Sequence, residues 1–187
     1  MNGLYKSAKK EAPPRNQFVD SAVRLFASGF YAGYVPAMPG TAGALLGILV
    51  YMTTLLKMNL KPLELFFIYL VLYLIGSFIC TLALEVFTEA DQSLIVVDKI
   101  LGGMIAVTAF APAVWTHAWP RLATAFLIYR LWEIAKFFPL KNVEKLPKGF
   151  GVMSDDVVGA LIALLITFYI PESLWDNLGW SVPPSPK

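Results

Sequence analysis

Residues 149–156 read Gly-Phe-Gly-Val-Met-Ser-Asp-Asp, and an apolar segment, Val157–Ile170, follows them directly. Asp155 and Asp156 therefore stand side by side at the start of a segment that suits a lipid environment. An ionisable side chain at membrane depth costs roughly 2.5 kcal/mol or more and usually marks a functional site. The stretch predicts a membrane helix with a polar site at its start.

A simpler interpretation of the same stretch is an ordinary helix start. Ser154 is a favourable N-cap, and acidic residues in the first helical turn suit the helix dipole. Gly149 and Gly151 would then supply a tight turn before the helix. The stretch alone does not decide between a helix start and a metal site.

The composition favours a membrane protein over a soluble domain. Of the 187 residues, 57% are hydrophobic and 15% charged, and the mean hydropathy is +0.63. A net charge of +2 gives no argument for nucleic acid as a partner. A single cysteine and a single histidine exclude an intrachain disulfide and the usual type of zinc site. Hydrolysis by a Ser-His-Asp triad would have to use His117, and no serine-centred elbow accompanies it.

Apolar periodicity sets the expected fold. Phe18, Ala22, Phe26 and Phe30 recur every four positions, which predicts an amphipathic helix over Phe18–Tyr34 at the membrane surface. Five apolar segments come later in the chain: Ala42–Leu56, Leu63–Leu84, Leu94–Trp115, Trp119–Phe138 and Val157–Ile170. Because some of these are short or charged, we expect an all-α integral membrane bundle with four or five membrane helices and the N-terminal amphipathic helix.

We expect a single domain over residues 17–175, between a mobile segment at 1–16 and a flexible tail at 176–187. Positive charges near the N-terminus place that end in the cytoplasm: Lys6, Lys9, Lys10 and Arg15. The basic loop Lys141–Lys148 should lie on the same side. The protein is then multi-pass, with its polar site facing the cytoplasm.

Charged side chains also interrupt two other apolar segments. Asp98 and Lys99 are adjacent in one, whereas Arg130, Glu133 and Lys136 follow one another at three-residue steps in the other and share a helix face. The plain interpretation is that each group forms its own ion pairs near a helix end. The functional interpretation is one shared polar cavity, where carboxylates bind Mg²⁺ and cations bind phosphate.

The stretch Pro39-Gly40-Thr41-Ala42-Gly43 also has two interpretations. Backbone N–H groups at a glycine-rich helix start can cradle a phosphate. Alternatively, Gly43 and Gly47 have the spacing of small residues at a close contact between membrane helices.

In order and spacing, these motifs resemble the phosphatidylglycerophosphatase A family. The resemblance covers roughly residues 26–170 and rests on four pieces: Pro39–Gly43, Asp91–Asp98, Tyr129-Arg130 with Lys136 and Pro139, and Gly151–Asp156. It implies a Mg²⁺-dependent phosphatase of a bacterial-type inner membrane. Such an enzyme converts phosphatidylglycerophosphate to phosphatidylglycerol and phosphate, so its partners are a phospholipid substrate and the bilayer.

The resemblance also implies roles for individual residues. The catalytic set is Asp98, Arg130, Glu133, Lys136, Asp155 and Asp156. Among these, the ligands of Mg²⁺ are Asp98, Glu133, Asp155 and Asp156. The groups that bind the substrate phosphate are Gly40, Thr41, Gly43, Arg130 and Lys136.

The chain departs from the family pattern at Lys99, where the family has glutamate, and at Glu133, where it has aspartate. The charge reversal at Lys99 supports an alternative function. In that alternative the protein is a catalytically silent relative that acts as a structural or accessory subunit, in a membrane complex or a homo-oligomer. An ammonium of Lys99 pointing into the carboxylate cluster, in the place of the metal, would favour it.

Overall fold

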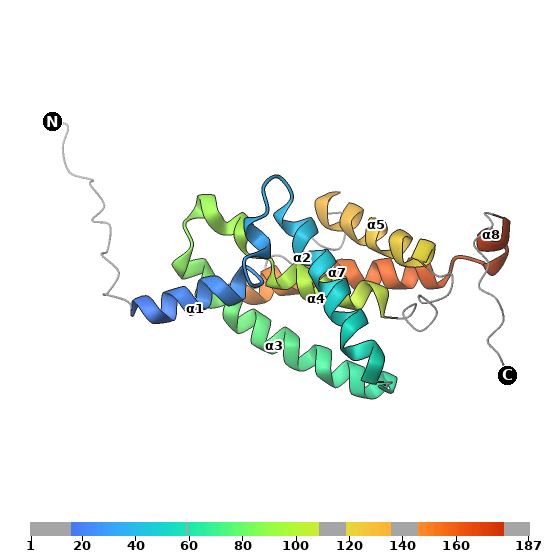
Figure 1. Cartoon of the computed structure of the whole chain (residues 1–187), viewed down its shortest axis with the longest axis horizontal. Helices are drawn as coiled ribbons and strands as arrows, with labels where there is room; N and C mark the ends of the chain where they lie inside the picture. Colours follow the sequence, from blue (N-terminus) through green and yellow to red (C-terminus); the bar gives the residue numbers. More distant parts are fainter. Residues whose placement is uncertain (1–15, 59, 109–118, 136–145, 178–187) are drawn as a thin grey trace.

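The computed structural model describes residues 16–58, 60–108, 119–135 and 146–177, and all regular elements within these ranges are helical. In chain order, with η for a 3₁₀ helix, they are α1 (Gln17–Ala27), η1 (Ala32–Tyr34), α2 (Pro39–Thr53), η2 (Leu55–Met58), α3 (Pro62–Val86), η3 (Glu89–Leu94), α4 (Val97–Val107), α5 (Trp119–Ala135), α7 (Gly149–Phe168) and α8 (Glu172–Asn177). The short helix α4 lies at the centre, and α2, α3, α5 and α7 pack around it (Figure 1). The expected all-α class is confirmed.

Three stretches of the described chain are long and apolar enough to cross a membrane: Pro39–Met58, Pro62–Val86 and Gly149–Phe168. This number is smaller than the four or five that the sequence predicts. One reason is length, because α4 has only 11 residues. Of the segment Trp119–Phe138, the structure describes Trp119–Ala135.

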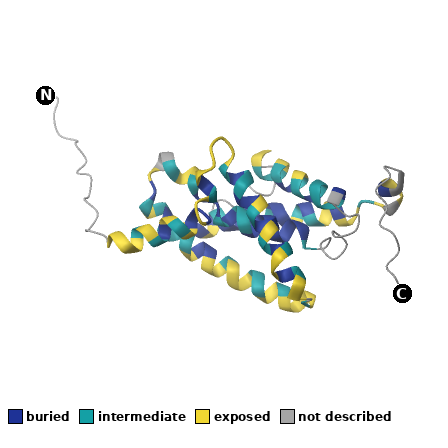
Figure 2. Ribbon diagram, in the orientation of Figure 1, coloured by how far each residue is buried: buried dark blue, intermediate teal, exposed yellow. Residues whose placement is uncertain are grey.

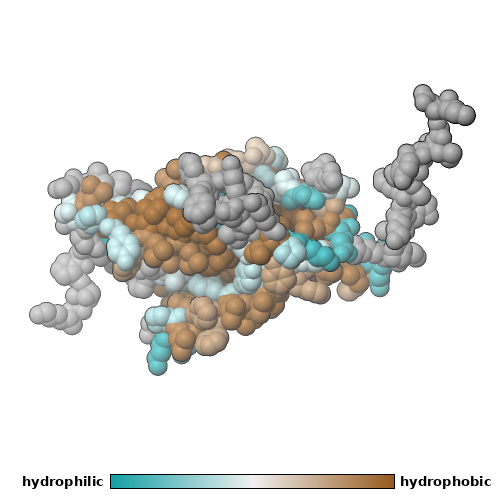
Figure 3. All heavy atoms as spheres, turned by 180° about the vertical axis from the view of Figure 1, so that it is seen from behind, coloured by the Kyte–Doolittle hydropathy of each residue, from teal (hydrophilic) through white to brown (hydrophobic). Residues whose placement is uncertain are grey.

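The outer surface is apolar, as expected for lipid contact. Along α3, large side chains face outward rather than into the core, as the yellow face of this helix shows in Figure 2: Leu63, Phe66, Phe67, Val71, Leu74, Ile75 and Phe78. Apolar side chains also cover much of the face seen in Figure 3. Water would disfavour so large an apolar surface, whereas a bilayer accommodates it.

Proline marks the starts of the two helices that form the α2–α3 hairpin. Pro39 and Pro62 both stand in the first turn, where a missing N–H costs no hydrogen bond. The carboxylate of Glu64 accepts a hydrogen bond of 2.8 Å from the backbone N–H of Lys61 and so caps α3.

The helix α1 is shorter than predicted, because it ends at Ala27 and a turn separates it from η1. Its apolar stripe points outward, with Phe18 and Phe26 exposed, while Val23 and Ala27 pack inward. The guanidinium of Arg24 donates to the carbonyl oxygen of Val86 at 3.0 Å, which ties α1 to the end of α3.

The start of α7 differs from the ordinary helix start that the simpler interpretation of residues 149–156 predicts. The helix begins at Gly149, so Ser154 is no N-cap and the carboxylates of Asp155 and Asp156 lie in its second turn, buried. Gly149 packs directly against the α3 backbone at Ser77, a place too tight for a side chain. The turn before α7 is made by Lys148, with φ of 54°, and not by a glycine.

Candidate active site

Three carboxylates from three helices surround the ammonium of Lys99. Lys99 Nζ lies 2.8 Å from Asp98 Oδ2 on α4, 3.2 Å from Asp156 Oδ2 on α7 and 3.7 Å from Glu133 Oε1 on α5. The side chains of Asp98 and Asp156 are each 2% exposed, and that of Lys99 is 20% exposed. Charges buried to this degree need such pairing, because an isolated charge would lose its hydration without compensation.

Asp156 is held from its other side by Tyr129. The hydroxyl of Tyr129, which is fully buried on α5, donates a hydrogen bond of 2.7 Å to Asp156 Oδ1. Gly102 of α4 makes room for this contact, since a Cβ at that position would collide with the Tyr129 hydroxyl. Tyr129 belongs to one of the family motifs, but the sequence analysis assigns it no role. The only feature of the sequence that pointed to Tyr129 was a hydroxyl group beside Arg130 in an apolar helix.

Arg130 is the second cation of the site. Its guanidinium forms an ion pair with Glu133, one turn further along α5. The start of α2 lies directly against both cations, because a Cβ at Gly40 would come within 3.0 Å of Lys99 Cδ and 3.1 Å of Arg130 Nη2. The glycine therefore allows α2 to begin where its free N–H groups can face an anion bound by these side chains.

Two cavities flank the cluster. The larger one, of about 480 Å³, is lined among others by the Pro39–Thr41 start of α2 and by Asp98, Lys99 and Arg130. The smaller one, of about 210 Å³, is lined by Asp98, Lys99, Glu133, Lys148, Val152, Asp155 and Asp156. The larger cavity thus offers groups suited to phosphate, the smaller is rich in carboxylates, and Asp98 and Lys99 border both.

Seven of the sequence-predicted site residues therefore line one or both of these adjoining cavities: Gly40, Thr41, Asp98, Arg130, Glu133, Asp155 and Asp156. Gly43 is not among them. It packs against Val96, just before α4, while Gly47 meets the backbone of Ile100, so the helix-contact interpretation of this pair is correct. Lys136 lies outside the described residues.

The arrangement does not fit the Mg²⁺ ion that the family resemblance implies. Carboxylate oxygens are suitable ligands for Mg²⁺. However, Asp98, Glu133 and Asp156 all face the ammonium of Lys99, which holds the position that a cation would take. Within the described part of the chain, no three Asp, Glu, His or Cys side chains form a group that could hold a metal.

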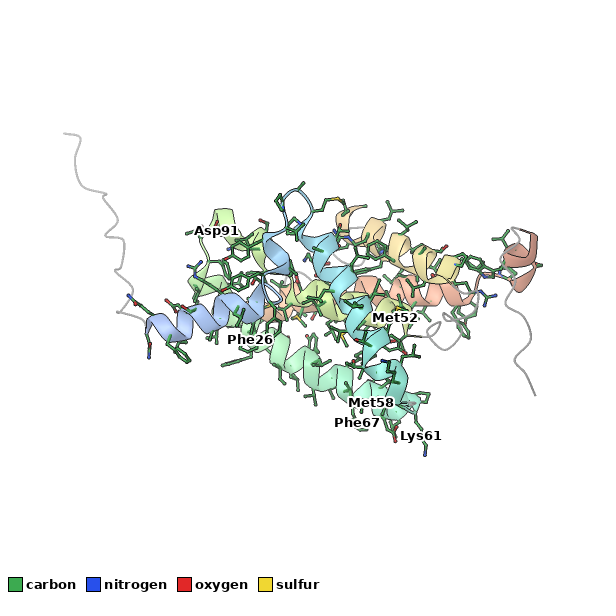
Figure 4. The ribbon with its side chains drawn as sticks, viewed as in Figure 1. Phe26, Met52, Met58, Lys61, Phe67 and Asp91 are labelled. Carbon is green, nitrogen blue, oxygen red and sulfur yellow. The ribbon has the colours of Figure 1, made fainter. Side chains whose placement is uncertain are left out.

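The site lies at one end of the long helix α3. Figure 4 labels Lys61, just before the start of α3, and Asp91, just after its end, and the two are far apart. Gln92 and Ser93, which follow Asp91, line the larger cavity. The site is therefore at the end of the molecule where α3 finishes and α2 and α7 begin.

Comparisons with a family model and with individual known proteins point to the same family. A family model described as Phosphatidylglycerophosphatase A matches residues 25–171. The protein named Phosphatidylglycerophosphatase A from Haemophilus influenzae is 33% identical over 150 residues, which are 79% of this chain and 88% of that protein. Its Escherichia coli namesake is 30% identical over 148 residues, or 78% and 81% of the two chains.

A third relative, from Bacteroides thetaiotaomicron, carries the provisional name phosphatidylinositol-3-phosphatase. It is 30% identical over 143 residues, which are 76% of this chain and 89% of that protein. No solved structure matches the chain significantly.

Proposed function

This chain belongs to the phosphatidylglycerophosphatase A family, and from that premise we propose that it hydrolyses phosphatidylglycerophosphate to phosphatidylglycerol and inorganic phosphate. The observation that carries the proposal is the larger cavity. It combines the Gly40–Thr41 helix start, the ammonium of Lys99 and the guanidinium of Arg130 with a carboxylate, Asp98.

The phosphate monoester is bound by the positive groups of this cavity. Arg130 offers a planar fork of N–H donors that matches two phosphate oxygens, and Lys99 adds a compact positive charge. Backbone N–H groups of the first α2 turn, at Gly40 and Thr41, bind a third oxygen. Lys136 is also proposed as a phosphate ligand, on the basis of the family motif alone.

Asp98 is the proposed general base, because it borders both cavities and contacts Lys99. It accepts a proton from water while the water oxygen attacks phosphorus and the bond from phosphorus to the glycerol oxygen breaks. Lys99 donates a proton to that glycerol oxygen and regains one from Asp98, 2.8 Å away. The products are a free hydroxyl on the lipid headgroup and phosphate. Glu133 and Asp156 hold the cations in place through their ion pairs with Lys99 and Arg130, and Asp155 lines the smaller cavity.

A lipid substrate agrees with the location of the site. Asp156 is seven residues into α7, about 10 Å along the helix axis, so the cluster lies near headgroup depth if α7 starts at the membrane surface. The acyl chains stay in the bilayer beside the apolar outer faces. The basic N-terminal segment supports a cytoplasmic orientation of the site in an inner membrane.

One observation favours the second candidate, a catalytically silent family member with a structural role. The ammonium of Lys99 lies among the carboxylates that the family resemblance assigns to Mg²⁺. The retained Asp98, Arg130, Asp155 and Asp156 favour the enzyme.

The test is phosphate release by the purified protein from mixed micelles that contain one phosphomonoester each. Phosphatidylglycerophosphate is compared with two other lipids, phosphatidic acid and phosphatidylinositol 3-phosphate. Glycerol 3-phosphate, which is soluble, is tested in the same buffer as a substrate without acyl chains. We expect the fastest release from phosphatidylglycerophosphate. Faster release from another lipid would reassign the substrate, and no release from any of them, with or without Mg²⁺, would favour the silent relative.

A further inference from the structure

We propose that the ammonium of Lys99 is a built-in replacement for a divalent cation, so that the native chain binds no Mg²⁺ in its carboxylate cluster. The part of this inference that concerns metal binding is independent of the proposed function. Its consequence for catalysis, that hydrolysis proceeds without a divalent cation, rests on that function.

The carboxylates are gathered as they would be around a cation. Asp98, Glu133 and Asp156 belong to three different helices, and each has a side-chain oxygen within 4 Å of Lys99 Nζ. Two of these contacts, to Asp98 and Asp156, are hydrogen bonds from the ammonium. An ammonium has three N–H donors, so these two hydrogen bonds leave one N–H for the substrate.

The ammonium is held in this position by its surroundings. The aliphatic stem of Lys99 packs against the start of α2, where a Cβ at Gly40 would lie 3.0 Å from its Cδ and 3.1 Å from its Cε. The carboxylates are fixed as well, since Asp98 accepts from the backbone N–H of Lys99 at 2.8 Å and Asp156 accepts from Tyr129. The cluster is therefore complete without a bound ion.

An Mg²⁺ ion and this ammonium exclude one another. Mg²⁺ requires oxygens at about 2.0–2.1 Å in octahedral geometry, and the oxygens best placed to supply them already bind Lys99. An ion at the same place would also be repelled by the ammonium beside it. Replacing Lys99 by a neutral or acidic side chain should free these oxygens and create a cation site.

The experiment measures metal binding directly in the purified full-length chain, by equilibrium dialysis with Mn²⁺ and by thermal unfolding with Mg²⁺. The variants are Lys99→Gln and Lys99→Glu. Lys148→Gln is the matched control, because it removes an exposed lysine that lines the same smaller cavity. Tm should rise by about 3–5 °C for each tenfold excess of Mg²⁺ over its Kd, wherever a site exists.

We expect no metal binding and no Mg²⁺-dependent Tm shift in the wild type or in Lys148→Gln, and both effects in Lys99→Glu. Lys99→Gln covers the case in which Lys99→Glu does not fold. Stoichiometric Mn²⁺ bound by the wild type and lost in Asp156→Asn would overturn the proposal, as would failure of both Lys99 variants to gain metal.

Hydrolysis is measured in parallel after treatment with EDTA, so that the two proposals can fail separately. If the wild type releases phosphate after any metal has been removed, the proposed function and the metal inference both stand. If it binds no metal and releases no phosphate under any condition, the proposed function fails and the metal inference stands. If the wild type binds metal and needs that metal for phosphate release, the proposed function stands and the metal inference fails.

Discussion

Arg130 and Lys99 carry the positive charge of the larger cavity, but only Arg130 presents a planar fork of donors. We expect Arg130→Lys to lower turnover by at least about tenfold with little change in Tm, because an ammonium cannot bind two phosphate oxygens as a guanidinium does. Arg121→Lys is the control. Arg121 is on the same helix, stacks over Trp175 and lines neither cavity of the site, so its replacement should leave turnover unchanged. Unchanged turnover in Arg130→Lys would assign Arg130 a structural role.

Tyr129 positions Asp156 without contacting the substrate. Tyr129→Phe removes the buried hydroxyl that donates to Asp156, which should cost about 1–3 kcal/mol of stability and lower turnover as well. Tyr73→Phe is the comparison, because it removes a hydroxyl that pairs with Ser154 on the same helix α7, at the same distance of 2.7 Å. Equal turnover in the two variants, measured beside their unfolding free energies, would show that Tyr129 acts on the fold alone.

At this scale the sequence predicts which charges meet but not how they pair. Asp98, Glu133 and Asp156 were predictable as a group, because buried charges in apolar segments must be gathered or hydrated. The direction of the Lys99 side chain and the bond from Tyr129 depend on how three helices pack, and no local pattern encodes that.

At the scale of the helices, the site depends on the contact between α2 and α4. Gly43 and Gly47 let α2 approach Val96 and Ile100, and Gly103 of α4 lies against the backbone of Ala44. This close approach brings the start of α2 over Lys99 and Arg130. The small-residue spacing of Gly43 and Gly47 predicts the contact, whereas nothing in the sequence identifies its partner.

Two glycines of α2 should respond differently to alanine. Gly40→Ala crowds the side chains of Lys99 and Arg130, which can move, so turnover should fall about tenfold with a small loss of stability. Gly43→Ala places a Cβ 2.7 Å from Val96 Cβ in a packed contact and should cost about 1–3 kcal/mol. Phosphate release and thermal unfolding of both variants check this, and a loss of stability alone in Gly40→Ala would contradict it.

The start of α7 shows where local rules mislead. Glycine and serine before an apolar run normally predict a turn and an N-cap. Here the helix continues back to Gly149, because this glycine lets it pack on α3 at Ser77 and Thr81. Tertiary packing outweighs the low helix propensity of glycine, which is about 1 kcal/mol per residue.

For the whole molecule, composition and apolar periodicity were enough to predict an all-α membrane protein. Within the described residues fewer helices are long enough to span than the sequence predicts, because α4 is apolar yet short and packs against α2, α3, α5 and α7. Its apolar residues pack in a protein core, and hydropathy alone cannot distinguish that from lipid contact.

The structure also predicts a topology. The helix α3 has 25 residues, about 37 Å, which is enough to cross the hydrocarbon core. In a Cys80→Ala background, where no other cysteine remains, Thr88→Cys at the site end should be labelled only from the cytoplasm and Lys61→Cys only from outside. Labelling of both positions from one side by an impermeant maleimide would rule out this arrangement.

The central claim is that the carboxylates and cations gathered around Lys99 form a lipid phosphatase site. The most direct test is phosphate release from phosphatidylglycerophosphate by the wild type and by Asp98→Asn, with thermal unfolding as the check on folding. We predict release by the wild type, with phosphatidylglycerol as the lipid product, and a loss of at least about 100-fold in a folded Asp98→Asn, because the amide cannot accept the proton. Undiminished release by Asp98→Asn, or no release by a folded wild type, would contradict the account.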